Sequence, residues 1–90
     1  MNFNDYQKEA LKTFVNNNNT RSEILARLAL GLVGEAAEVA EKIKKKLRGD
    51  YNHKLYSFNL DTKKEIGDLC WYIANLTDFL DLDFEDLTFF

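Results

Sequence analysis

Two pairs of acidic side chains are the residues in this sequence whose types and spacing best fit chemistry. Glu35 and Glu38 form the first pair, and Glu65 and Asp68 form the second. Residues three apart lie on one side of a helix, with Cβ atoms about 5–6 Å from each other. Glu35 also falls in line with the apolar positions of its helix, where an unpaired carboxylate is very costly. We therefore expect all four acids to share a divalent cation, and oxygen ligands favour Mg²⁺, with Mn²⁺ possible, over zinc.

Small and polar residues accompany both pairs at helical spacing. Gly31 and Gly34 share an arc with the first pair, and a mid-helix glycine costs roughly 1 kcal/mol relative to alanine. A ligand or a neighbouring helix is expected to approach there, with plain helix packing as the alternative. Tyr72 and Asn75 share an arc with the second pair and could contact phosphate oxygens or a base. The alternatives are a core-edge tyrosine and a solvated asparagine.

Lysines near the first acidic pair are candidates for neutralising phosphate charge. Lys42 lies one turn beyond Glu38 and Lys45 follows on roughly the same side, and a lysine ammonium acts on phosphate as a point charge. A solvated lysine face would produce the same pattern. Tyr6 and Gln7 are further candidates for base recognition. Trp71 is expected to point away from the carboxylates, into the core or an interface.

The composition predicts one small domain over residues 1–90. The formal charge of −3 is no larger than the four candidate ligands would contribute, which argues against binding driven by nucleic-acid phosphates or an anionic membrane. The single cysteine, Cys70, cannot form an internal disulfide. The start of the chain lacks a signal-peptide pattern, and no apolar run approaches a membrane span. We expect a cytoplasmic protein.

The chain contains no proline, and its apolar residues recur at helical spacing. This pattern predicts an all-α compact helical bundle with three main helices and a short C-terminal helix. The expected ranges are 4–16, 20–48, 61–80 and 84–89, with residues 49–60 forming a loop that contains one short helical turn. Expected caps are Asn4 with Gln7 for the first helix, Thr20 with Glu23 for the second and Asp61 for the third.

At the acidic motifs the chain resembles the MazG family of nucleoside triphosphate pyrophosphohydrolases. That family carries an ExxE motif, a spacer of roughly one to three dozen residues and an ExxD motif. Glu35-xx-Glu38 and Glu65-xx-Asp68 match it, with residues 39–64 between them. The surrounding segments 31–41 and 65–73 are also similar to the two helix motifs of the family, including small phage-type members.

The resemblance implies a bundle that assembles into a homodimer or homotetramer and hydrolyses a nucleoside triphosphate to a monophosphate and pyrophosphate with Mg²⁺. It implies the four acids as metal ligands, with Glu35 or Glu38 orienting or deprotonating the attacking water. Two alternatives stay open. One is a related hydrolase with a dedicated substrate, and the other is a non-catalytic oligomeric helical module or nucleotide sensor that keeps the metal site.

Overall fold

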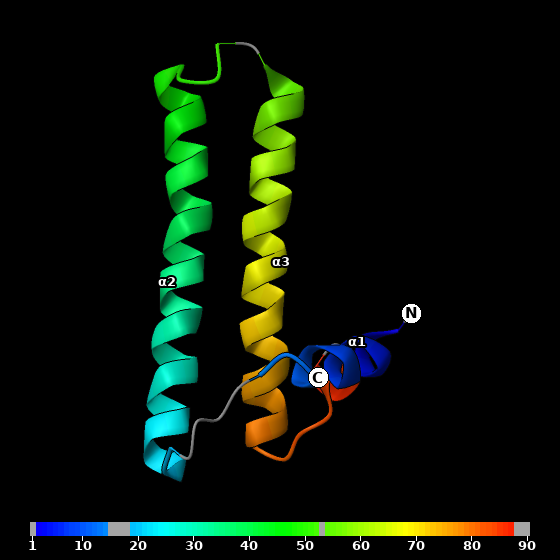
Figure 1. Cartoon of the computed structure of the whole chain (residues 1–90). Helices are drawn as coiled ribbons and strands as arrows, with labels where there is room; N and C mark the ends of the chain where they lie inside the picture. Colours follow the sequence, from blue (N-terminus) through cyan, green and yellow to red (C-terminus); the bar gives the residue numbers. More distant parts are fainter. Residues whose placement is uncertain (1, 15–18, 53, 88–90) are drawn as a thin grey trace.

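The computed structural model describes residues 2–14, 19–52 and 54–87. Four helices follow one another along these residues, so the predicted all-α class is confirmed. The two longest, α2 (Arg21–Arg48) and α3 (Leu55–Phe79), stand side by side as an antiparallel hairpin, and α1 (Phe3–Leu11) crosses the lower part of α3 (Figure 1). The short α4 (Phe84–Leu87) lies next to α1. No helix of the described residues combines the length and apolar character that crossing a membrane requires.

Helix α2 begins and ends where the sequence predicts. The Thr20 side chain accepts a hydrogen bond from the Glu23 backbone N–H, and the Glu23 carboxylate accepts one from the Thr20 N–H. This capping box satisfies two backbone donors that the helix leaves without partners. At the other end Gly49 has a left-handed backbone, with φ of 92°. Glycine adopts this conformation without steric cost, which lets the chain turn sharply after Arg48.

Helix α3 begins at Leu55, six residues before the predicted start, so the expected cap at Asp61 is wrong. Asp61 lies inside the helix, where its carboxylate accepts a hydrogen bond of 3.0 Å from the Tyr51 hydroxyl. The Tyr51 ring also packs edge-on against the Phe58 ring, with centroids 5.3 Å apart. These contacts between the turn and the helix favour a helix that begins before Asp61. They outweigh the tendency of an aspartate to cap a helix N-terminus.

Helix α1 differs from its prediction at both ends. Its N-terminal capping box pairs Asn2 with Asp5, rather than Asn4 with Gln7. The helix ends at Leu11 instead of continuing to residue 16, and part of the predicted extension lies outside the described residues. Its short length places Lys12 and Thr13 in a turn rather than a helix, and the Thr13 hydroxyl donates to the Ala10 carbonyl at 3.0 Å.

Two amide side chains of α1 hold the C-terminal part of the chain. The buried Gln7 side chain donates to the Leu82 carbonyl at 3.1 Å and accepts from the Phe84 backbone N–H at 2.9 Å. Asn4 exchanges two hydrogen bonds with Glu85, at 3.1 and 2.9 Å. The predicted last helix is confirmed over Phe84–Leu87, and its final residues fall outside the described part of the chain.

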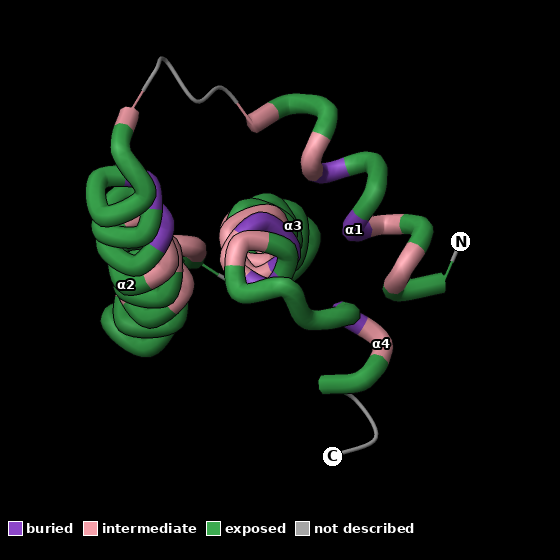
Figure 2. Tube along the Cα trace, turned by 90° about the horizontal axis from the view of Figure 1, so that it is seen from below, coloured by how far each residue is buried: buried purple, intermediate pink, exposed green. Residues whose placement is uncertain are grey.

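The buried core lies at the lower end of the molecule, around α3. Viewed along the hairpin, α2 packs on one side of α3, and α1 with α4 packs on the other (Figure 2). A cluster of Ala10, Ala74 and Phe84 joins α1, α3 and α4, while Ile24 and Leu28 are buried on α2. The upper part of the hairpin, which extends beyond α1, has only the contact between α2 and α3 among the described residues.

Candidate metal centre

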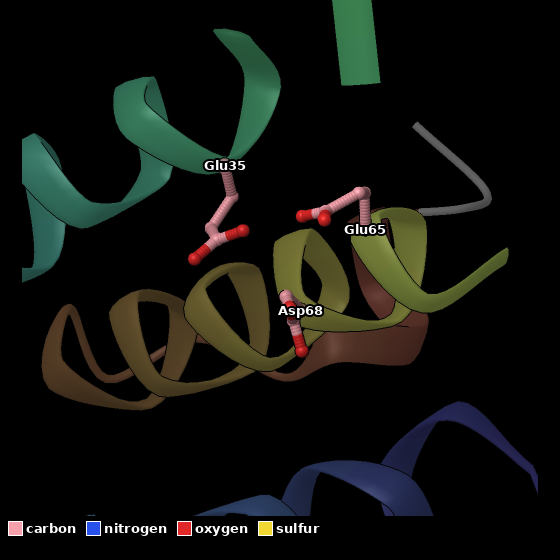
Figure 3. A group of neighbouring side chains, drawn as sticks. All are labelled: Glu35, Glu65 and Asp68. Atoms are coloured by element: carbon pink, nitrogen blue, oxygen red, sulfur yellow. The ribbon is translucent and has the colours of Figure 1, made fainter. Parts of the chain in front are cut away.

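Three carboxylates from two helices meet in the middle of the hairpin. Glu35 projects from α2 toward α3, where Glu65 and Asp68 lie one turn apart (Figure 3). One carboxylate oxygen from each residue can be chosen so that all three lie within 4.8 Å of one another. Glu35 and Glu65 are half-buried and Asp68 is exposed. The helix contact thus gathers three of the four acids that the sequence singles out.

The close approach of the two helices beside these acids depends on Gly31. A Cβ atom built on Gly31 would clash with the aromatic ring of Tyr72 from α3. The ring therefore occupies the space that any larger residue would fill, one turn before Glu35 on α2. The expected need for room is confirmed at Gly31, where a neighbouring helix supplies the group. At Gly34 a Cβ atom would meet nothing within 4 Å, so close packing does not explain that glycine.

The acids raise the cost of ionising Glu35. Partial burial raises the pKa of the Glu35 carboxyl above its ordinary value of 4.5, and the charges of Asp68 and Glu65 raise it further. Hydrogen bonding to Glu65 and the charge of Glu38 add smaller contributions in the same direction. A cation placed among the three carboxylates would reverse this effect, because an opposite charge favours the ionised form.

A cavity of about 430 Å³ opens beside the three acids. It is lined by Glu35 and Asp68 together with three residues that carry rings or a hydroxyl, namely Thr13, Trp71 and Tyr72. The indole of Trp71 donates a 2.6 Å hydrogen bond to the Thr13 hydroxyl. The Trp71 and Tyr72 rings are nearly perpendicular, with centroids 4.9 Å apart. Acidic oxygens and aromatic surface therefore face the same space.

Two of these lining residues differ from what the sequence predicts. Trp71 packs against the core cluster, as predicted, but it does not point away from the carboxylates, because it also lines the cavity with Glu35 and Asp68. Helical periodicity alone misplaces it, since its hydrogen bond to Thr13 holds the ring on the side facing the end of α1. Thr13 carries no sequence signal of its own, because it lies far from the motifs along the chain and reaches the cavity only through the packing of α1 on α3.

Glu38 and the two candidate lysines lie around the three acids rather than within them. Glu38 is exposed on α2, and it is not part of the group of three neighbouring carboxylates among the described residues. Lys42 and Lys45 are half-buried further along the same helix. Lys42 lies seven residues beyond Glu35, which corresponds to two turns and about 10 Å along the axis.

The remaining polar candidates take part in packing between helices. Asn75 is 2% exposed, and its amide donates to the Ala10 carbonyl of α1 at 3.5 Å and to the Trp71 carbonyl of its own helix at 3.0 Å. It is not a lining residue of the cavity. Gln7 binds the segment that leads into α4. Tyr6 is half-buried on α1, and burial raises the pKa of its phenol, with smaller contributions from Cys70 and Asp68.

Fold and site together define an all-α chain in which two antiparallel helices gather three carboxylates, two of which line one aromatic-walled cavity. No family model matches the chain, and no solved structure matches it. Among curated proteins it is similar to the gene 37 protein of Mycobacterium phage L5, with 42% identity over 60 residues. The matched segment covers 67% of this chain and 53% of the phage protein, so the chain spans about half the length of that relative.

Proposed function

We propose that this protein is a Mg²⁺-dependent nucleoside triphosphate pyrophosphohydrolase of the MazG type. It would convert a ribo- or deoxyribonucleoside triphosphate to the monophosphate and pyrophosphate. The observation that carries this proposal is the convergence of Glu35 from α2 with Glu65 and Asp68 from α3, with ligand oxygens within 4.8 Å of one another. An exposed acidic group alone is common in proteins, and the proposal gains support from the adjoining aromatic cavity and the two spaced motifs.

The three carboxylates fit a hard divalent cation. They offer oxygen ligands only, which suits Mg²⁺ or Mn²⁺. Partial burial, together with the charges of Asp68 and Glu65, raises the pKa of Glu35, and a bound cation would offset this shift. Mg²⁺ bound there would neutralise phosphate charge and lower the pKa of a bound water. Glu35, Glu65 and Asp68 are the proposed ligands, and the exposed Glu38 would complete the set or act on the water.

The chain's own residues then account for positioning and proton transfer. In the proposed reaction a water oxygen attacks the α-phosphorus, and the bond to the oxygen that bridges the α- and β-phosphorus breaks as pyrophosphate leaves. Glu38 or Glu35 would accept the proton from the attacking water. Of the two, Glu38 is favoured because it is exposed and lies outside the group of three.

Substrate binding is assigned to the cavity and to the lysines of α2. The cavity volume of about 430 Å³ lies within the usual range of about 300–1,000 Å³ for small-molecule sites. Tyr72 and Trp71 would contact the base or sugar, while Lys42 and Lys45 would neutralise the phosphates. In this proposal the reacting α-phosphate would lie near the acids, between the aromatic wall and the lysines.

Nucleotide turnover with identified products tests the proposal. We expect the protein with Mg²⁺ to release pyrophosphate from at least one member of a panel of (deoxy)ribonucleoside triphosphates, and EDTA to abolish the release. Glu35→Gln and Asp68→Asn should each lower kcat/KM at least about a hundredfold, a loss comparable to that of one electrostatic contact to the transition state. Glu41→Gln is the matched control, because Glu41 lies on α2 but outside the group of three acids.

Unchanged turnover in both Glu35→Gln and Asp68→Asn would contradict the proposed site. The helical circular dichroism of each variant must match that of the parent protein for the comparison to count. Orthophosphate in place of pyrophosphate as the product would contradict the assignment of attack at the α-phosphorus while leaving a metal-dependent hydrolase.

A non-catalytic oligomeric module or nucleotide sensor is the second candidate. It is favoured by the large apolar side chains that α2 leaves exposed, among them Leu30 at 72% and Val33 at 66%. A protein whose main task is assembly would present such a face. Thermal stabilisation by Mg²⁺ and nucleotide without any turnover across the panel would support this candidate over the enzyme.

A further inference from the structure

We propose that the tip of the α2/α3 hairpin is a second binding site, for a nucleoside monophosphate. A cavity of about 380 Å³ lies there, between the last turn of α2 and the first turn of α3. This volume falls in the range typical of small-molecule sites. The cavity walls combine ammonium groups, aromatic rings and an amide, and the lining residues include Lys46, Gly49, Tyr51, Asn52, Lys54 and Phe58.

The charge of the cavity favours an anion. Lys46 and Lys54 both line it, and neither forms an ion pair with another described residue. The two nearby acids have other partners, because Asp50 pairs with Arg48 and Asp61 accepts the hydroxyl hydrogen of Tyr51. No acidic residue lines the cavity among the described residues. Two positive charges therefore face the space without a carboxylate opposite them, as a phosphate group requires.

The aromatic residues favour a flat ring as the other part of the ligand. Tyr51 and Phe58 are half-buried and pack edge-to-face at an interplanar angle of 75°. The Lys46 ammonium lies 5.3 Å from the centre of the Phe58 ring, a cation–π contact that holds it at the wall. Nucleobases stack on such rings, and the Asn52 amide offers both a donor and an acceptor to a base edge. A ligand with a phosphate and a base fits this lining, because the lysines can bind the phosphate and the rings and the amide can bind the base.

The tip cavity is distinct from the acidic site. Lys46 lies eleven residues beyond Glu35 on α2, which is about 16 Å along the helix axis. The two cavities share no lining residue. Because none of the described residues that line the tip is acidic, binding there requires no divalent cation. This difference allows the two sites to be tested separately.

Titration with adenosine 5′-monophosphate in EDTA, followed by amide chemical shifts, tests this site. We expect saturable shifts at Gly49 and Asn52, while the amides of Gly31 and Gly67, which flank the acids, stay unchanged. Lys54→Gln and Lys46→Gln should each raise Kd by about tenfold, because hydrogen bonds to charged groups are the stronger kind. Lys44→Gln is the matched control, since Lys44 lies on the same turn of α2 as Lys46 but does not line the cavity.

Three outcomes would overturn the proposal. They are the absence of shifts at Gly49 and Asn52 at millimolar nucleotide, an unchanged Kd in both Lys46→Gln and Lys54→Gln, and inorganic phosphate binding as tightly as the nucleotide. The last outcome would remove the role of the aromatic rings. Because the titration contains no metal, failure of the tip site leaves the proposed hydrolase unaffected, and loss of hydrolase activity leaves the tip site unaffected.

Discussion

Glu35 is the residue at which stability and proposed function oppose each other. Its pKa is raised in the folded chain by partial burial and by Asp68 and Glu65. The folded state therefore binds a proton at Glu35 more tightly than the unfolded state does. By linkage, the contribution of Glu35 to the free energy of unfolding decreases as the pH rises from below 4.5 through the raised pKa. Without metal, ionised Glu35 destabilises the fold at neutral pH.

The destabilising effect of ionised Glu35 leads to a prediction for the melting temperature of the metal-free protein. In EDTA at pH 7 we expect Glu35→Gln to raise Tm, because the neutral amide removes a partly buried charge and its repulsion by Asp68 and Glu65 without changing the size of the side chain. The gain should shrink as the pH falls toward 4, where Glu35 takes up its proton. Addition of Mg²⁺ at pH 7 should raise the Tm of the parent protein more than that of the variant. Differential scanning calorimetry at several pH values measures all of these changes, and a lower Tm for Glu35→Gln in EDTA would contradict the linkage.

The sequence identifies Glu35, Glu65 and Asp68 because each is defined by local spacing within one helix. It cannot show that Glu38 lies outside their close group, since the rotation of α2 relative to α3 depends on packing. The sequence also does not predict that Trp71 and Thr13 line the cavity, because the hydrogen bond between them joins residues 58 positions apart. Local periodicity therefore predicts which residues share a helix face, and tertiary contacts decide which faces line the cavity.

At the scale of the element, the two glycines of α2 have different physical roles. Gly31 makes room for the Tyr72 ring, whereas Gly34 is exposed, with open space where a Cβ atom would stand. An alanine in a helix is more stable than a glycine by roughly 0.5–1 kcal/mol when nothing opposes it. The same substitution should therefore have opposite effects at two positions that are one turn apart.

We expect Gly34→Ala to raise the free energy of unfolding by about 0.5–1 kcal/mol, and to leave any turnover unchanged. Gly31→Ala should instead lower it by about 1–3 kcal/mol, as overpacking does, and should raise KM because the Tyr72 ring must move. Urea unfolding together with steady-state kinetics separates the two effects. Equal stabilisation by both alanines would show that Tyr72 does not depend on Gly31.

The elements themselves are predicted best where capping is local. The Thr20–Glu23 box and Gly49 fix both ends of α2, and both are readable from sequence. The start of α3 is missed because Tyr51, in the preceding turn, contacts Phe58 and Asp61 of the helix. Asn4 and Gln7 are missed as tethers because their partners lie near the other end of the chain. From the sequence alone, their amides are interpreted as helix caps, whereas in the structure they bind residues near the C-terminal helix.

For the whole molecule, the buried core is small relative to the apolar surface. Only five apolar residues of the described chain are buried, and thirteen large apolar side chains are exposed. A chain of this size is marginally stable alone, so association would supply what the core lacks. At 100° per residue, Leu25, Val33 and Ile43 fall on one broad side of α2 together with several exposed alanines. A second copy of the hairpin placed on this side would form a four-helix bundle.

We expect the protein to be a homodimer or a larger even assembly, and Val33→Glu to shift it toward the monomer with a lower Tm. Light scattering coupled to size-exclusion chromatography measures the mass directly. Lys63→Glu, which changes charge on an exposed position of α3, is the control. A parent protein that elutes as a monomer at all concentrations would contradict this prediction.

The most direct test of the central claim is the position of a bound metal ion. Crystals grown with Mn²⁺ and a non-hydrolysable nucleoside triphosphate analogue would locate the ion by its anomalous scattering. We expect Mn²⁺ coordinated by carboxylate oxygens of Glu35, Glu65 and Asp68, with the α-phosphate of the analogue beside it. A metal ion bound elsewhere while these three carboxylates contact only solvent would contradict the proposed centre.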